Sequence, residues 1–306
     1  MRYVEFGYWP QTVKADDVTV YTKLSKSMGM FTYYLGSDGN WYVEAKENAL
    51  KENALGNDIE YRYSNGEQVG QGGTTTKWFK VEPIVWRVLT ENYIDADGKS
   101  TGNALLLAES ILTGGIKWAD SKNDYMESNI RKWLNGNSGT GENSDYSGTP
   151  GFLQTAFTAD AQSLIAETEV DNSAASTNPA SNPNLWSGGN NPYACGNTTD
   201  KIFLLSQKEA TTSEYGFAEY NVYVGDNNGT TTSTRIRVTT DYAKATGANQ
   251  SFMAGPGGLW WLRSPNFDED YIAHDIDDYG DAYYGNFVYN AYGGVVPALS
   301  ISLGGN

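Results

Sequence analysis

The last forty residues constrain the fold of this chain more than any other part of it. Two apolar segments, residues 259–265 and 294–299, indicate rigid core on either side of a polar run. Residues 266–292, which lie between them, include six tyrosines and six aspartates, and no Lys or Arg follows Arg263. Because both flanks must be buried, the run has to leave the core and return to it. We expect Trp260 and Trp261 to brace this run from beneath.

The residue types of the run are typical of a binding surface. Tyrosine supplies a large contact area at little entropic cost, and small polar residues adapt their hydrogen bonds. Aromatic residues on a surface are also enriched where proteins bind partners. We expect Ile272, Ile276 and Val288 to face inward and to anchor the strands. The residues that we expect to face outward and bind the ligand are Asp268, Asp270, Tyr271, His274, Asp275, Asp277, Asp278, Tyr279, Asp281, Tyr283, Tyr284, Asn286, Phe287, Tyr289, Asn290 and Tyr292.

The charge of the chain narrows the classes of partner. The formal net charge of −16 argues against nucleic-acid binding, because contacts to phosphates need clustered Lys and Arg. The same charge disfavours anionic membrane surfaces. No stretch is long and apolar enough for a membrane helix, and the chain opens with strand-like sequence rather than with a signal peptide. We expect no direct membrane insertion by this chain.

The chain has one cysteine and one histidine, and this limits the chemistry that it can perform. Cys195 cannot form an intrachain disulfide, and no basic neighbour would activate its thiol. A single histidine excludes the usual His-rich zinc sites. A Ser-His-Asp triad would have to use His274, inside the aromatic run. We therefore expect no cofactor and no metal.

Strand signals at both ends and helix signals in the middle predict an α+β fold. Alternating or apolar stretches predict strands at residues 2–13, 31–35 with 41–43, 78–89, 104–108 and 201–206. Helical spacing predicts helices at residues 128–135, 152–165, 207–210 and 240–244. Residues 171–199, rich in Asn, Ser, Pro and Gly, predict a long surface loop. We expect the two ends of the chain to join one sheet.

Six ordered segments, spread over most of the chain, carry a resemblance to a known family. They are FGYWPQ at 6–11, VEPIVWRVL at 81–89, SNIRKWL at 128–134, DKIFLLS at 200–206, WWLRSP at 260–265 and GVVPAL at 294–299. The set resembles the bacterial domain related to the formylglycine-generating enzyme, a variant of the C-type lectin fold. The resemblance implies a single C-type-lectin-like domain over residues 1–306, with short strands, two or more helices and long loop insertions. The last segment departs from the family pattern, because Val296 stands where an arginine usually precedes the proline.

Within that fold, the C-terminal run resembles the variable region of proteins diversified by retroelements, in particular those of Treponema. Adenine-directed mutagenesis of Asn codons in that family favours Asn, Asp, Tyr, Gly, Ser, His and Phe. Most residues of this run belong to these types. The resemblance implies a variable protein with massive sequence variation confined to a ligand-binding region at residues 259–299. It further implies a monomeric surface lipoprotein, anchored through an export sequence absent from this chain, that binds a protein or glycan on another cell or host surface.

Other interpretations of the acidic run stay open. It could be a solvated acidic surface, or a fixed-specificity surface that binds a glycan or calcium. Residues 275–280 resemble the start of an EF-hand loop, but position twelve is Asn286 rather than Glu and no flanking helices are predicted. A lectin-like calcium site could use the same carboxylates.

Two further classes of protein are alternatives. A glycoside-active enzyme needs two carboxylates at a defined separation, and nothing in the sequence marks such a pair. The chemistry of the formylglycine-generating enzymes uses two cysteines, whereas this chain has one. A structural surface-layer role would predict self-assembly and a flat surface that binds no ligand. We expect a receptor rather than an enzyme.

Overall fold

The computed structural model describes residues 1–52, 58–136, 150–218, 234–250, 257–282 and 285–303. Its largest element is an eight-stranded sheet with the order β10-β15-β6-β5-β4-β3-β2, in which β1 also pairs with β5. These strands are β1 (Arg2–Val13), β2 (Val20–Met28), β3 (Phe31–Gly36), β4 (Trp41–Lys46), β5 (Thr76–Thr90), β6 (Ala104–Ala108), β10 (Ile202–Phe203) and β15 (Ala298–Ile301). Both ends of the chain therefore join one sheet, as expected, although β5 and β6 separate β1 from β15.

Strand β5 organises the sheet because it has partners on both edges. Strand β1 pairs with it along one edge, while β4 and β6 share the other edge. The strand continues through Pro83, which cannot donate a backbone hydrogen bond. Strand β1 changes register between Glu5 and Tyr8, opposite this proline. Gly7 lies in that bulge with φ at 73°, a conformation that glycine adopts without a steric penalty.

An aromatic cluster joins the sheet to the helices. The Trp9 ring lies 5.0 Å from Phe152 and 6.0 Å from Trp133, measured between ring centroids. These residues come from β1, α2 (Phe152–Ala156) and α1 (Asn129–Asn135). Helix α1 begins where the Ser128 side chain accepts a hydrogen bond from the Arg131 amide. Its apolar face fills the space beside β1, so the helix is stabilised by packing rather than by its length.

The expectation of one helix over residues 152–165 is wrong. The chain leaves the helical conformation at Phe157 and Thr158, and Thr158 caps a second helix, α3 (Ala159–Leu164). Phe157 packs its ring 4.9 Å from Phe6 of β1, so its side chain is directed into the core. A continuous helix would carry that ring away from the sheet, and this tertiary contact outweighs local helix propensity.

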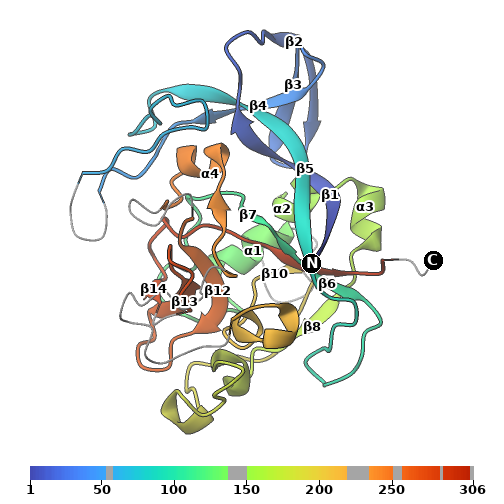
Figure 1. The fold of residues 1–306 in the computed structure, drawn as a ribbon, viewed down its shortest axis with the longest axis vertical. Helices are drawn as coiled ribbons and strands as arrows, with labels where there is room; N and C mark the ends of the chain where they lie inside the picture. Colours follow the sequence, from blue (N-terminus) through green and yellow to red (C-terminus); the bar gives the residue numbers. More distant parts are fainter. Residues whose placement is uncertain (53–57, 137–149, 219–233, 251–256, 283–284, 304–306) are drawn as a thin grey trace.

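Three smaller sheets and several short helices complete the α+β fold. In Figure 1 the β2–β3 hairpin projects at the top, whereas β12, β13 and β14 lie at the lower left. The remaining strands are β7 (Ser110–Ile111), β8 (Thr168–Val170), β9 (Thr198–Asp200), β11 (Val238–Thr239), β12 (Trp260–Pro265), β13 (Ile272–Ile276) and β14 (Asn286–Phe287). The other helices are α4 (Asp241–Ala245), η3 (Ala174–Thr177), η4 (Ser187–Gly189), η5 (Glu209–Thr211) and η6 (Ser213–Tyr215). No helix in the described ranges could span a membrane.

Candidate functional site

The C-terminal run rests on two buried antiparallel strands. Every residue of β12 and of β13 is buried. Trp260 and Trp261 are fully buried, so the expectation that they belong to the scaffold is confirmed. The Trp260 indole donates to the carbonyl of Arg235, and the Trp118 indole donates to the carbonyl of Leu262. These bonds satisfy the polar edges of buried rings and fix the position of β12.

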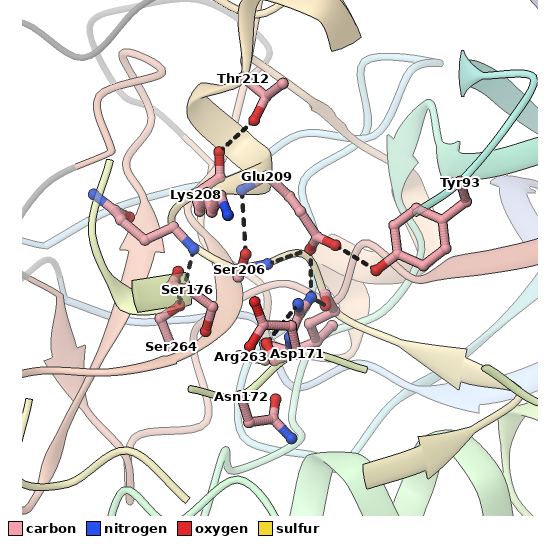
Figure 2. A network of polar contacts seen from close by, with 12 residues as sticks. Tyr93, Asp171, Asn172, Ser176, Ser206, Lys208, Glu209, Thr212, Arg263 and Ser264 are labelled. Carbon is pink, nitrogen blue, oxygen red and sulfur yellow. Dashed lines mark hydrogen bonds and ion pairs between the residues drawn. The ribbon is translucent and has the colours of Figure 1, made fainter. Parts of the chain in front are cut away.

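A buried ion pair ties β12 to the rest of the core. The Glu209 carboxylate lies between the Arg263 guanidinium and the Tyr93 hydroxyl, and it accepts a hydrogen bond from each (Figure 2). Burial alone would raise the pKa of Glu209, but the charge and hydrogen bond of Arg263, with hydrogen bonds from Tyr93 and Ser206, outweigh burial and lower it. The Arg263 Nη1 also donates to the carbonyl of Leu204 at 2.7 Å. The strand beneath the site is therefore held by charge as well as by packing.

The structure places fourteen of the sixteen predicted site residues, in three environments. Four are exposed, namely Asp268, Tyr279, Phe287 and Tyr289. Eight are half-buried, namely Asp270, Tyr271, Asp277, Asp278, Asp281, Asn286, Asn290 and Tyr292. His274 and Asp275 are buried, and Tyr283 and Tyr284 lie outside the described residues. Ile272, Ile276 and Val288 are buried, as expected.

The outward placement expected for His274 and Asp275 is wrong. Both lie in β13, which pairs with β12 on one edge and with β14 on the other. Strict alternation of inward and outward side chains holds only for a strand with one face in solvent. Here all five residues of β13 are buried, so both faces of the strand are covered. These two side chains are part of the support of the site and not of its surface.

Three aromatic rings stack along the surface next to β14. The Tyr271 ring lies 5.8 Å from Phe287, and the Phe287 ring lies 5.3 Å from Tyr289 with 6° between the ring planes. Phe287 is 42% exposed and Tyr289 is 44% exposed. We call Tyr271, Phe287 and Tyr289 the aromatic patch. Their parallel rings limit one another's rotation, so the patch presents a defined shape.

A second stack involves a residue that the sequence did not reveal. Trp186, in the long 171–199 segment, lies 5.0 Å from Phe267 with 10° between the ring planes, and 6.0 Å from His274. Phe267 follows β12, whereas Trp186 directly precedes η4, eighty-one positions earlier in the chain. Nothing local in the sequence connects the two, and only the density of aromatic residues in both segments could have suggested the contact.

Between the two stacks lies an acidic turn, which we define as Asp268, Glu269 and Asp270. It connects Phe267 of one stack to Tyr271 of the other. The Asn123 side chain donates to the carbonyls of Asn266, Glu269 and Ile272 at 3.3, 2.9 and 2.7 Å. The backbone N–H of Asn123 donates to the carbonyl of Asp270 at 2.7 Å. The backbone of the acidic turn is thus fixed by a buried asparagine.

A chain of side-chain hydrogen bonds connects buried Asp275 with the surface. Asn290 donates to the Tyr292 hydroxyl at 3.0 Å, and that hydroxyl donates to Asn286 Oδ1 at 2.6 Å. The Asn286 amide then donates to Asp275 Oδ2. Burial raises the pKa of Asp275 to about 7, although the Asn286 hydrogen bond opposes the shift. These hydrogen bonds consequently hold Asn286, Asn290 and Tyr292 in place, in addition to any contact that they make with a ligand.

The segment that resembles an EF-hand loop is a tight turn after a strand. Asp275 lies within β13, and Asp277 Oδ1 accepts the amides of Tyr279 and Asp281 at 2.9 and 2.8 Å. Burial raises the pKa of Asp277 to about 6. The Arg235 Nε donates to the carbonyl of Gly280 at 2.7 Å and holds the turn from beneath. Among the described residues, no group of three or more His, Cys, Asp or Glu side chains is arranged to hold a metal ion.

The fold and the surface together define an α+β protein with an aromatic and acidic face on a buried β-sheet support. The chain belongs to the family described as a domain of unknown function, DUF6273, which matches residues 101–303. No curated protein and no solved structure matches the chain. The matched range includes both aromatic stacks, the acidic turn and the buried Glu209–Arg263 ion pair.

Proposed function

We propose that this protein is a non-enzymatic receptor that binds its ligand at a diversified C-terminal surface, residues 259–299. The scaffold proposed is the C-type-lectin-like fold of the formylglycine-generating-enzyme type, and the functional class proposed is the variable protein of a diversity-generating retroelement. The ligand is a protein or glycan on another cell or host surface. The receptor acts as a monomer, anchored by lipid at the bacterial surface, and uses no cofactor or nucleic acid.

The observation that carries this proposal is the exposure of Phe287 and Tyr289 above a fully buried support. Large aromatic side chains at a binding surface provide much contact area for few rotatable bonds. Rings that are already stacked lose little further entropy when a ligand covers them, so the patch is pre-organised. Stability depends on β12 and β13, whereas recognition would depend on the patch and the turns.

The separation between buried residues that stabilise the fold and exposed residues that would bind the ligand supports diversification. Substitutions at exposed positions of a domain usually change stability by less than about 0.5 kcal/mol. Asp268, Tyr279, Phe287 and Tyr289 are exposed, so they could vary widely while the buried strands keep the fold. Asn286 and Tyr292 are more constrained, because their hydrogen bonds lead to buried Asp275.

The first test is to sequence the C-terminal coding segment across independent isolates, together with the neighbouring DNA. We expect substitutions concentrated at the Asn, Asp, Tyr and Phe positions of residues 266–292, beside a near-copy repeat and a reverse transcriptase gene. An invariant segment without such a repeat would refute the diversified receptor. A fixed-specificity binder or a glycoside-active enzyme would then have to be considered again.

A further inference from the structure

The acidic turn and the aromatic patch together select one chemical class of partner. Residues 264–306 contain seven acidic residues and no Lys or Arg, so this segment is negatively charged. Three of the seven form the acidic turn, between two stacks of aromatic rings. The turn is therefore continuous in sequence with one ring of each stack.

Within the described ranges, two carboxylates of the turn, those of Glu269 and Asp270, have no ion-pair partner in the chain. Lys122 directly precedes Asn123, which holds the turn, but among the described residues no ion pair within 4.0 Å joins Lys122 to Glu269 or Asp270. Arg235 is buried under the separate 277–281 turn. In the described part of the chain, no Lys or Arg lies over the ring of Phe287 or Tyr289. The carboxylates of Glu269 and Asp270 and these two ring faces are thus available to an external cation.

Resting on the function proposed above, we propose that the ligand is a basic protein surface whose arginine side chains stack on Phe287 and Tyr289 and pair with the acidic turn. A planar guanidinium stacks on aromatic faces and binds carboxylates in a bidentate manner, which a lysine ammonium cannot do. Tyr271 directly follows Asp270 in the chain and stacks on Phe287. One residue therefore links the Asp270 carboxylate to the stacked rings. Complementary charge also speeds association and makes it sensitive to salt.

The test measures binding of three synthetic peptides to the immobilised full chain: six Arg-Gly repeats, six Lys-Gly repeats and six Glu-Gly repeats. We expect the arginine peptide to bind several-fold more tightly than the lysine peptide, and the glutamate peptide not to bind. The double variant Phe287→Ser, Tyr289→Ser and the triple variant Asp268→Asn, Glu269→Gln, Asp270→Asn should each weaken arginine-peptide binding at least tenfold. Thermal unfolding of each variant shows whether the fold is retained.

Matched controls separate a site from general attraction to a chain of charge −16. Tyr3 and Tyr8 are 46% and 53% exposed, close to Phe287 and Tyr289, so Tyr3→Ser, Tyr8→Ser removes equivalent aromatic surface elsewhere. The triple variant Glu5→Gln, Asp16→Asn, Asp17→Asn removes three exposed charges from the N-terminal region. We expect less than a twofold effect from either control.

Each outcome decides the proposal. Equal losses in the test and control variants, or no binding of the arginine peptide, would overturn the basic partner. Binding of a neutral protein or a glycan that needs Phe287 and Tyr289 but tolerates the triple acidic variant would overturn it as well, while leaving the receptor function intact. Conversely, an invariant coding segment would refute the diversified receptor even where arginine-peptide binding is found.

Discussion

Glu209 and Arg263 form an ion pair whose two side chains are almost completely withdrawn from solvent, at 11% and 1% exposure. The pair (Figure 2) joins the segment after β10 to β12, a strand of the buried support of the proposed binding surface. Tyr93 adds a hydrogen bond of 2.6 Å from its hydroxyl to the same carboxylate. A buried charge is stable only beside a partner of opposite charge. The position of β12 therefore depends on a few buried contacts.

Breaking this pair from one side is expected to destabilise the fold strongly. Glu209→Gln leaves the Arg263 charge buried without an anion, which costs about 3–5 kcal/mol in comparable buried pairs. Urea unfolding of the wild type and variant measures this loss. The double variant Glu209→Gln, Arg263→Met should be less destabilised than the sum of the two single variants. Additive losses would show that the two side chains do not stabilise one another.

Asp275 is expected to make stability fall as the pH rises from about 4 to 7. Its folded-state pKa of about 7 lies above the value of about 3.9 for an unfolded chain. The folded protein therefore favours the protonated carboxyl, and this stability is complete below the unfolded pKa and lost as pH rises through the folded one. Asp275→Asn keeps an acceptor for Asn286 and should remove this dependence, which is on the order of a few kcal/mol.

Thermal unfolding midpoints from pH 4 to pH 8 test this expectation. The wild type should lose more stability over this range than Asp275→Asn. Asp278→Asn, at a half-buried position three residues along, is the matched control and should follow the wild-type curve. Parallel curves for the wild type and Asp275→Asn would rule out Asp275 as the source of the pH dependence.

The bulge at Gly7 is expected to tolerate no side chain. A Cβ at this position would lie 2.5 Å from the Phe157 ring and 2.9 Å from the carbonyl of Ala156. Gly39 has a similar positive φ of 80°, but no atom lies within 4 Å of its Cβ position. Gly7→Ala and Gly39→Ala therefore share the backbone penalty, and the clash should cost Gly7→Ala a further 1–3 kcal/mol or so. Urea midpoints measure the difference, and equal midpoints would contradict the close packing of β1 on Phe157.

The thiol of Cys195 is expected to react slowly in the folded protein. Burial raises its pKa to about 11, against about 8.5 for a free cysteine. At pH 8 the thiolate fraction, and with it the rate of alkylation by iodoacetamide, should be roughly 200-fold lower than for a free thiol. The same measurement in denaturing urea supplies the reference rate. A folded-state rate close to that reference would contradict the structure around Cys195.

Much of the scaffold was predictable from local pattern. The boundaries of β1 agree with the predicted 2–13 range, and the apolar 104–108 stretch forms β6. Short-range alternation and apolar runs encode such strands directly. The burial of Trp260 and Trp261 also followed from their place in an apolar segment.

The details of the site were less predictable because distant contacts determine them. His274 and Asp275 carry polar side chains, and their burial depends on residues packed over both faces of β13, such as Trp186 beside His274. The stack of Trp186 on Phe267 joins two segments that no local pattern links. The helix break at Phe157 likewise depends on Phe6, about 150 residues earlier in the chain. Local pattern thus describes the strands, whereas the exposure of each site residue depends on tertiary packing.

The pairing of β6 with β5 also has a practical consequence. The DUF6273 match begins at residue 101, whereas the strand that completes the sheet beside β6 spans Thr76–Thr90. Expressing residues 101–306 alone would leave the buried strand Ala104–Ala108 with an open, apolar edge, which invites pairing between molecules. We expect such a fragment to aggregate, so crystallisation or display of this protein should start from the longer polypeptide that includes β1 and β5.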